Sequence, residues 1–152
     1  MKTCRLIPVA VLLLCFSFAC GDGDNPMNSD PAFSNLVGTW EAIKDEFTNK
    51  ADTSQKVDAV SEGLGGITLR IQSNGSFEVT ISLFGSPFLT LNGTARVERN
   101  KLILSYDGLG EIEYEYTLEN DRLTTIYNDA THDFDGDGND EPATEVTVYV
   151  KT

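Results

Sequence analysis

The acidic stretch from residue 133 to residue 141 carries aspartate at three alternate positions, Asp133, Asp135 and Asp137, followed at once by Gly138. Calcium takes six to eight oxygen ligands and favours several carboxylates in one site. Aspartates at this spacing can point three side chains at one centre, and the glycine permits a sharp turn of the backbone around it. The stretch therefore predicts a calcium site, with a solvated acidic loop that holds no ion as the alternative.

The same stretch resembles the first half of an EF-hand-type calcium loop. In that resemblance the three aspartates are ligands, and Asn139 offers its backbone carbonyl. The second half departs from the pattern, because Thr144 stands where a bidentate glutamate belongs and Pro142 where a helix would begin. We therefore expect structural Ca²⁺ in a loop inserted in the last hairpin, with Glu141 or Glu145 completing its shell.

Residues 1–19 have the character of a bacterial export signal. Lys2 and Arg5 precede an apolar run over residues 6–16, which is too short for a membrane-spanning helix. The segment ends in a sequence that resembles the lipobox of bacterial lipoproteins, a family in which the cysteine, here Cys20, becomes residue one and carries lipid. This predicts a signal peptide over 1–19 and a lipid anchor in the outer membrane, facing the periplasm or the cell surface. The alternative is an ordinary secretory signal that leaves Cys20 as a free thiol.

Loss of the signal removes Cys4 and Cys15, so Cys20 would be the only cysteine of the mature chain and no internal disulfide could form. Residues 20–34 are rich in Gly, Asp, Asn, Pro and Ser, a composition that buries little apolar surface. We expect them to be a flexible tether. The remaining residues, 35–152, are enough for one domain.

The charge balance excludes some classes of function. The chain has 24 acidic and 11 basic residues, a formal net charge of −13, which argues against nucleic-acid binding through phosphates. The only histidine, His132, lies beside the acidic stretch, so neither a zinc site nor a catalytic triad is indicated. Glu111, Glu113 and Glu115 alternate along one strand and form an exposed acidic row. We expect a protein that is not an enzyme.

Apolar and polar residues alternate with a period of two from Leu36 onward, so that each run has one apolar and one wet face. With the segment around Trp40 these runs make about eight strands, in the range for a small closed barrel. The other runs cover residues 67–72, 77–83, 89–98, 102–106, 112–119, 123–127 and 146–150, the last with Val146, Val148 and Val150 as its apolar face. Short turns at Asn74-Gly75, Asn100-Lys101 and Asn120-Asp121 favour an antiparallel up-and-down barrel over a β-sandwich.

Two further features affect the strand count. Asn92-Gly93 has the form of a hairpin turn, but the alternation passes through it in register, so we expect a continuous strand that bends at an inward Gly93. The connection from residue 49 to residue 66 is long. We expect either a short helix over the barrel mouth, with Val57, Val60 and Leu64 facing down, or a mobile loop.

The segment Leu36-Val37-Gly38-Thr39-Trp40, at the start of an eight-strand meander, resembles the bacterial lipocalin-like lipoproteins. The resemblance implies that Gly38 and Trp40 belong to a plug at the closed end, that a basic residue, with Arg122 as candidate, packs over the tryptophan, and that the interior binds a small apolar ligand. The alternative is a barrel filled by its own side chains, which acts as a structural or interaction protein of the envelope with an unidentified protein partner. The bulky residues expected to point inward favour it: Phe77, Phe88, Tyr106, Tyr114, Tyr116 and Tyr127.

Overall fold

The structure is a computed structural model, which describes residues 31–152 apart from residue 64. The expected signal peptide, Cys20 and most of the expected tether lie outside the described residues. One helix and nine strands follow in order: α1 (Pro31–Leu36), β1 (Gly38–Asn49), β2 (Lys56–Asp58), β3 (Gly66–Ile71), β4 (Ser76–Leu83), β5 (Ser86–Glu98), β6 (Lys101–Tyr106), β7 (Gly110–Glu119), β8 (Arg122–His132) and β9 (Glu141–Lys151). Within this described part, no helix is long and apolar enough to cross a bilayer.

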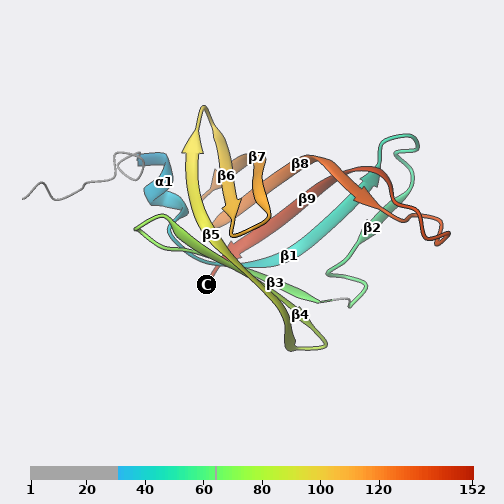
Figure 1. Cartoon of the computed structure of the whole chain (residues 1–152), viewed down its shortest axis with the longest axis horizontal. Helices are drawn as coiled ribbons and strands as arrows, with labels where there is room; N and C mark the ends of the chain where they lie inside the picture. The colour runs from blue at the N-terminus through green and yellow to red at the C-terminus, as the bar shows by residue number, and fades with distance from the viewer. Residues whose placement is uncertain (1–30, 64) are drawn as a thin grey trace, which may run out of the picture.

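The sheet closes on itself. Consecutive strands from β3 to β9 pair antiparallel, and β1 pairs antiparallel with both β3 and β9. The β1–β9 ladder is long, running from Trp40 opposite Lys151 to Asn49 opposite Ala143. Eight antiparallel strands therefore form a closed barrel, with β2 as an additional strand (Figure 1). The expected all-β barrel is confirmed, and the sandwich is wrong because the two outer strands pair with each other.

The two ends of the barrel differ. Gly38 lies opposite Ile71, and three short turns, after β3, β5 and β7, lie at the same end, which we call the closed end. The opposite end, called the open end, carries the β4–β5 and β6–β7 turns, the long connection after β1, and the loop of residues 133–140 (Figure 1). The expected short turns are confirmed, although the β5–β6 turn consists of Arg99 and Asn100, one residue earlier than expected.

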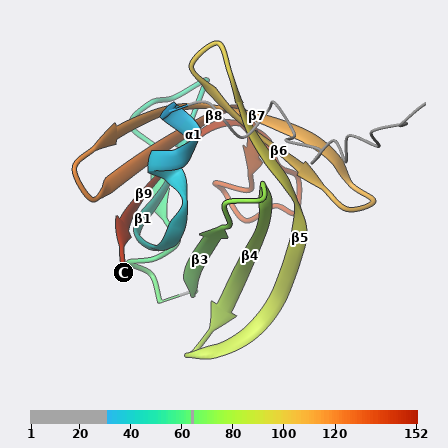
Figure 2. The same ribbon diagram turned by 90° about the vertical axis from the view of Figure 1, so that its left-hand side faces the viewer.

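α1 covers the closed end, as the view along the barrel shows (Figure 2). Phe33 and Leu36 are fully buried in the core, and the Trp40 indole Nε1 donates a hydrogen bond to the Leu36 carbonyl at 2.8 Å. The expected tether boundary at residue 34 is therefore corrected. Residues 31–34 belong to the helix, because Phe33 supplies enough apolar surface to fix a segment that is otherwise polar.

Trp40 is fully buried near the closed end of the barrel. Lys151, rather than Arg122, lies over the Trp40 ring, with its ammonium 5.0 Å from the ring centroid. A Cβ at Gly38 would meet the Lys151 side chain at 2.6 Å, and the backbone there has a φ of +145°. The tip of this lysine could move aside, but the positive φ favours glycine at the start of the strand.

β5 is continuous through Asn92 and Gly93, so the expected strand is confirmed. A Cβ at Gly93 would lie 1.9 Å from the Ser105 carbonyl oxygen and 2.8 Å from the Phe77 ring, which explains the inward glycine. Phe88, expected inside, is 71% exposed, because it lies at an irregularity in the β4–β5 register and on the outward side of β5.

The long connection after β1 forms neither the expected helix nor an unattached loop. Its strand β2 pairs with Glu46–Thr48 of β1, beyond the part of β1 that pairs with β3. The Asp58 carboxylate accepts hydrogen bonds from the backbone N–H of Asp45 at 3.1 Å and of Val60 at 3.2 Å. Val60 packs against the core cluster. The connection is therefore fixed to the barrel wall by strand pairing, by the Asp58 hydrogen bonds and by the packing of Val60.

Candidate functional site: a barrel cavity and an acidic loop

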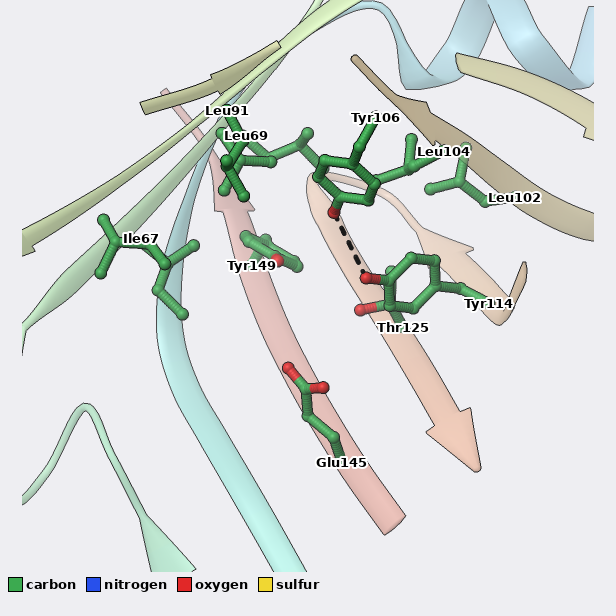
Figure 3. A pocket seen from close by; sticks show the side chains of 12 residues that line it. Ile67, Leu69, Leu91, Leu102, Leu104, Tyr106, Tyr114, Thr125, Glu145 and Tyr149 are labelled. Atoms are coloured by element: carbon green, nitrogen blue, oxygen red, sulfur yellow. Dashed lines mark hydrogen bonds between the residues drawn. The ribbon is translucent and has the colours of Figure 1, made fainter. Parts of the chain in front are cut away.

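A cavity of about 130 Å³ lies inside the barrel (Figure 3). Its aliphatic wall comes from β3 to β6, and its polar wall from β6 to β9. The lining residues are Ile67, Leu69, Val79, Ile81, Leu91, Leu102, Leu104, Tyr106, Tyr114, Thr125, Glu145 and Tyr149. The arrangement suits a small molecule with an apolar body and one polar end.

Three tyrosines form the aromatic side of the cavity. The hydroxyls of Tyr106 and Tyr114 lie 3.4 Å apart and share a hydrogen bond, and the Phe77 ring meets Tyr106 edge to face at 5.0 Å (Figure 3). Burial raises the pKa of Tyr106, Tyr114 and Tyr149 above the ordinary value for a tyrosine. These hydroxyls therefore remain neutral, and within the Tyr106–Tyr114 pair one hydroxyl donates to the other.

Glu145 of β9 projects its carboxyl group into the cavity (Figure 3). Asp45 of β1 is buried behind it, and the two carboxyls lie close enough to share a hydrogen bond. The Thr147 hydroxyl donates a hydrogen bond to Asp45 Oδ1 at 2.9 Å. Burial first, and then the negative charge of Asp45, raises the pKa of Glu145 to about 7. Burial also raises the pKa of Asp45.

This polar wall is the part of the site that the sequence reasoning missed. The expected inward face of the last strand was Val146, Val148 and Val150, but Thr147 and Tyr149 are the buried residues. The inward register of β9 is thus shifted by one, and it brings Glu145 inside. Glu145 was expected near calcium, and it lies in the barrel instead. The available signal was Tyr149, a large aromatic residue out of phase with the valines.

The acidic loop of residues 133–140, which joins β8 to β9, gathers four carboxylates. Oxygens of Asp133, Asp135, Asp137 and Glu141 all lie within 4.8 Å of one another. Two oxygens that bind one calcium ion at ~2.4 Å can be at most about 4.8 Å apart, so the spacing fits one ion. The donors are all oxygens, which suits calcium and not a structural zinc site.

Backbone amides orient these carboxylates. Asp133 accepts hydrogen bonds from the N–H of Gly138 at 2.9 Å and of Gly136 at 2.7 Å, which lower the pKa of its carboxyl. Gly138 has a φ of +89°, the left-handed conformation that the turn requires. The Asn139 N–H donates to Asp137 at 2.8 Å, and Glu141 accepts from the Phe134 N–H at 2.8 Å. The loop therefore brings Glu141, and not Glu145, to the three aspartates.

Two other sequence features have packing or surface roles. His132 stacks on Phe47 with ring centroids 5.0 Å apart and meets Phe134 at 4.9 Å, so it packs at the base of the loop. In the exposed acidic row, Glu111 pairs with Arg96 at 2.8 Å and Glu113 with Lys101 at 2.7 Å. The row thus meets basic partners within its own chain.

No family model matches the chain, and a search of curated proteins finds no match. The class of the protein accordingly rests on its own fold. That fold is a closed barrel of eight antiparallel strands with one extra strand, and it is compatible with a lipocalin-like architecture.

Proposed function

We propose that this protein is a lipid-anchored lipoprotein of the bacterial cell envelope whose lipocalin-like barrel binds a small, largely apolar ligand and does not catalyse a reaction. The observation that carries the proposal is the interior cavity of about 130 Å³ with its aliphatic wall. An apolar cavity of about 150 Å³ is large enough to bind benzene. The ligand would therefore be about the size of one aromatic ring.

The acidic loop has a supporting role in this proposal. Calcium bound to Asp133, Asp135, Asp137 and Glu141 would neutralise four clustered carboxylates and fix the start of β9. Extracellular calcium modules work at ~10⁻⁴ to 10⁻³ M, so modest affinity is sufficient outside the cytoplasm. The ion would be structural, and β9 in turn places Glu145 in the cavity.

A second candidate is a structural or interaction protein of the envelope, with a barrel too full to hold a ligand. The observation that favours it is the crowding of the interior by Phe77, Tyr106, Tyr114 and Tyr149, which leaves only the small cavity described above. The partner would then dock on the outer surface.

Native mass spectrometry of residues 21–152, purified from a lipid-containing bacterial host, tests both candidates and the ion. We expect the mass of the chain plus one calcium ion plus a small organic adduct. Calcium without an adduct, together with no uptake of ring-sized compounds, would favour the filled barrel. A bare chain in calcium-containing buffer would contradict the metal site.

A further inference from the structure

We propose that the ligand is a small amine, whose cationic head binds the Asp45–Glu145 carboxyl pair while its apolar body fills the cavity. This inference rests on the proposed function, because it names the chemical class of the ligand for the same cavity. The amine would approach Glu145 directly, since Glu145 lines the cavity and Asp45 lies behind it.

The first argument is that the pair has no cation of its own. Asp45 and Glu145 interact with each other and with Thr147, and no basic side chain in the part of the chain that the structure describes pairs with either. Asp58 adds a further negative charge nearby. A buried anion without a partner is costly, so a cationic ligand is the species that such a site favours.

The second argument is the shape of the surrounding wall. Tyr106, Tyr114 and Tyr149 line the cavity on the same polar side as Glu145, and the aliphatic wall lies across from them (Figure 3). Aromatic faces attract cations, and this attraction grows when water is excluded. Tyrosine hydroxyls also supply hydrogen bonds at the polar end. An amine with a ring-sized apolar body matches both walls at once.

The third argument excludes the other charge types. A carboxylate ligand would face the negative charge of the pair at close range, which is repulsive in a site of low dielectric constant. A neutral ligand could fill the apolar part but would leave the buried charge without a partner. The amine is the one class that gains from both parts of the cavity.

Titration calorimetry with three probes of nearly equal size tests the inference on the full chain: benzylamine, benzyl alcohol and benzoate. We expect benzylamine to bind more tightly than benzyl alcohol, and benzoate not to bind. The cation should favour the fully ionised pair, so benzylamine affinity should rise from pH 6 to pH 8 by at most about tenfold per pH unit. Below pH 7, binding should release protons into the buffer. The titratable groups around Glu145 are Asp45, Tyr106, Tyr114 and Tyr149, and Asp58 lies near Asp45. The three tyrosines stay neutral over this pH range, so the two buried carboxyls determine the pH dependence.

Glu145→Gln is the informative variant, because the amide keeps the shape of the protonated acid and can still donate to Asp45. We expect it to lower the affinity for benzylamine roughly ten- to a hundredfold, as for loss of a charge-assisted hydrogen bond, and to abolish the proton release. Glu113→Gln, which changes an exposed carboxylate paired with Lys101, is the matched control. It should change neither the affinity for benzylamine nor the proton release.

The outcomes separate this inference from the proposed function. Equal binding of benzylamine and benzyl alcohol, unaffected by Glu145→Gln, would overturn the amine and leave an apolar binding protein. Failure of all three probes to bind would contradict both the amine inference and the proposed ligand-binding function.

Discussion

Polar side chains turned inward distinguish this barrel at the level of single residues. Asp45, Thr125, Glu145 and Thr147 come from the neighbouring strands β1, β8 and β9, and three of them are almost completely buried. A barrel selected only for stability would fill these positions with aliphatic residues. The desolvation of a buried carboxyl pair destabilises the folded state by more than its remaining interactions stabilise it. Such a departure from the apolar pattern is expected where a protein binds or reacts.

The raised pKa of Glu145 predicts how stability depends on pH. The group titrates near 4.5 when unfolded and near 7 when folded, so the folded state binds the proton more tightly. Its contribution is fully present below about pH 4.5 and is lost as the pH rises through 7. Urea denaturation should therefore give a lower free energy of unfolding at pH 8 than at pH 5.

Glu145→Gln should flatten this dependence, since the amide does not titrate. Glu111, whose pKa is lowered to about 2 by Arg96, contributes in the opposite direction, but only below about pH 4.5, outside the range compared. A wild-type stability that rises from pH 5 to pH 8, or an unchanged slope in the variant, would contradict the burial of this carboxyl.

Gly93 is a residue within a barrel strand at which an added methyl group should be costly. The new Cβ would overlap the Ser105 carbonyl and the Phe77 ring, so strand β5 would have to move. We expect Gly93→Ala to lower the free energy of unfolding by about 1–3 kcal/mol, the usual range for overpacking. Gly66→Ala, at the exposed start of β3 with no atom within 4 Å of the new Cβ, is the control and should change it by less than ~0.5 kcal/mol. Chemical denaturation of both variants makes the comparison, and equal stabilities would refute it.

At the scale of the elements, the alternation of apolar and polar residues predicted most strands and the hairpin order, because a strand with one wet face has a period of two. The alternation gives the wrong answer where side-chain size or closure of the barrel determines the structure. In β9 the alternation places the valines inward, although Tyr149 buries more surface and closure against β1 fixes the register. The alternation does not predict α1, because only Phe33 and Leu36 of this short helix are fully buried and the residues between them are polar. For the acidic loop, spacing alone predicts that the three aspartates cluster. Only the fold shows that Glu141 lies beside them and that Glu145 lies in the barrel.

The loop between β8 and β9 should make barrel stability depend on calcium. Chelation should lower the melting temperature by a few degrees, corresponding to about 1–2 kcal/mol for a site of modest affinity at millimolar calcium. Asp135→Ala should lower it similarly and should abolish the response to chelator, because it removes one of the four clustered carboxylates. Glu113→Ala removes an exposed pair and should have little effect. A melting temperature unaffected by chelation would exclude the ion.

At the scale of the whole molecule, the described chain enters the barrel through α1 at the closed end, and the acidic loop lies at the opposite end (Figure 1). The cavity extends from the middle of the barrel toward that opposite end, where Ile67 and Glu145 line it. A lipid on Cys20 would thus hold the molecule from the side of its plug. The open end would then be free to face solvent, where calcium and small ligands diffuse. Anchoring and binding would therefore be separable, since they involve opposite ends of the molecule.

Cys20→Ser tests that separation in the native host. The variant cannot carry a thioether-linked lipid, so we expect it to move from the membrane fraction to the soluble fraction after cell disruption. Its calcium response and its affinity for ring-sized ligands should equal those of the wild type, because both depend only on residues of the barrel and its loop. Glu113→Ala, which retains the cysteine, should stay in the membrane fraction. A Cys20→Ser protein that remains with the membrane would show that another part of the chain holds it there. The expected orientation, with the closed end toward the membrane, would then have no support.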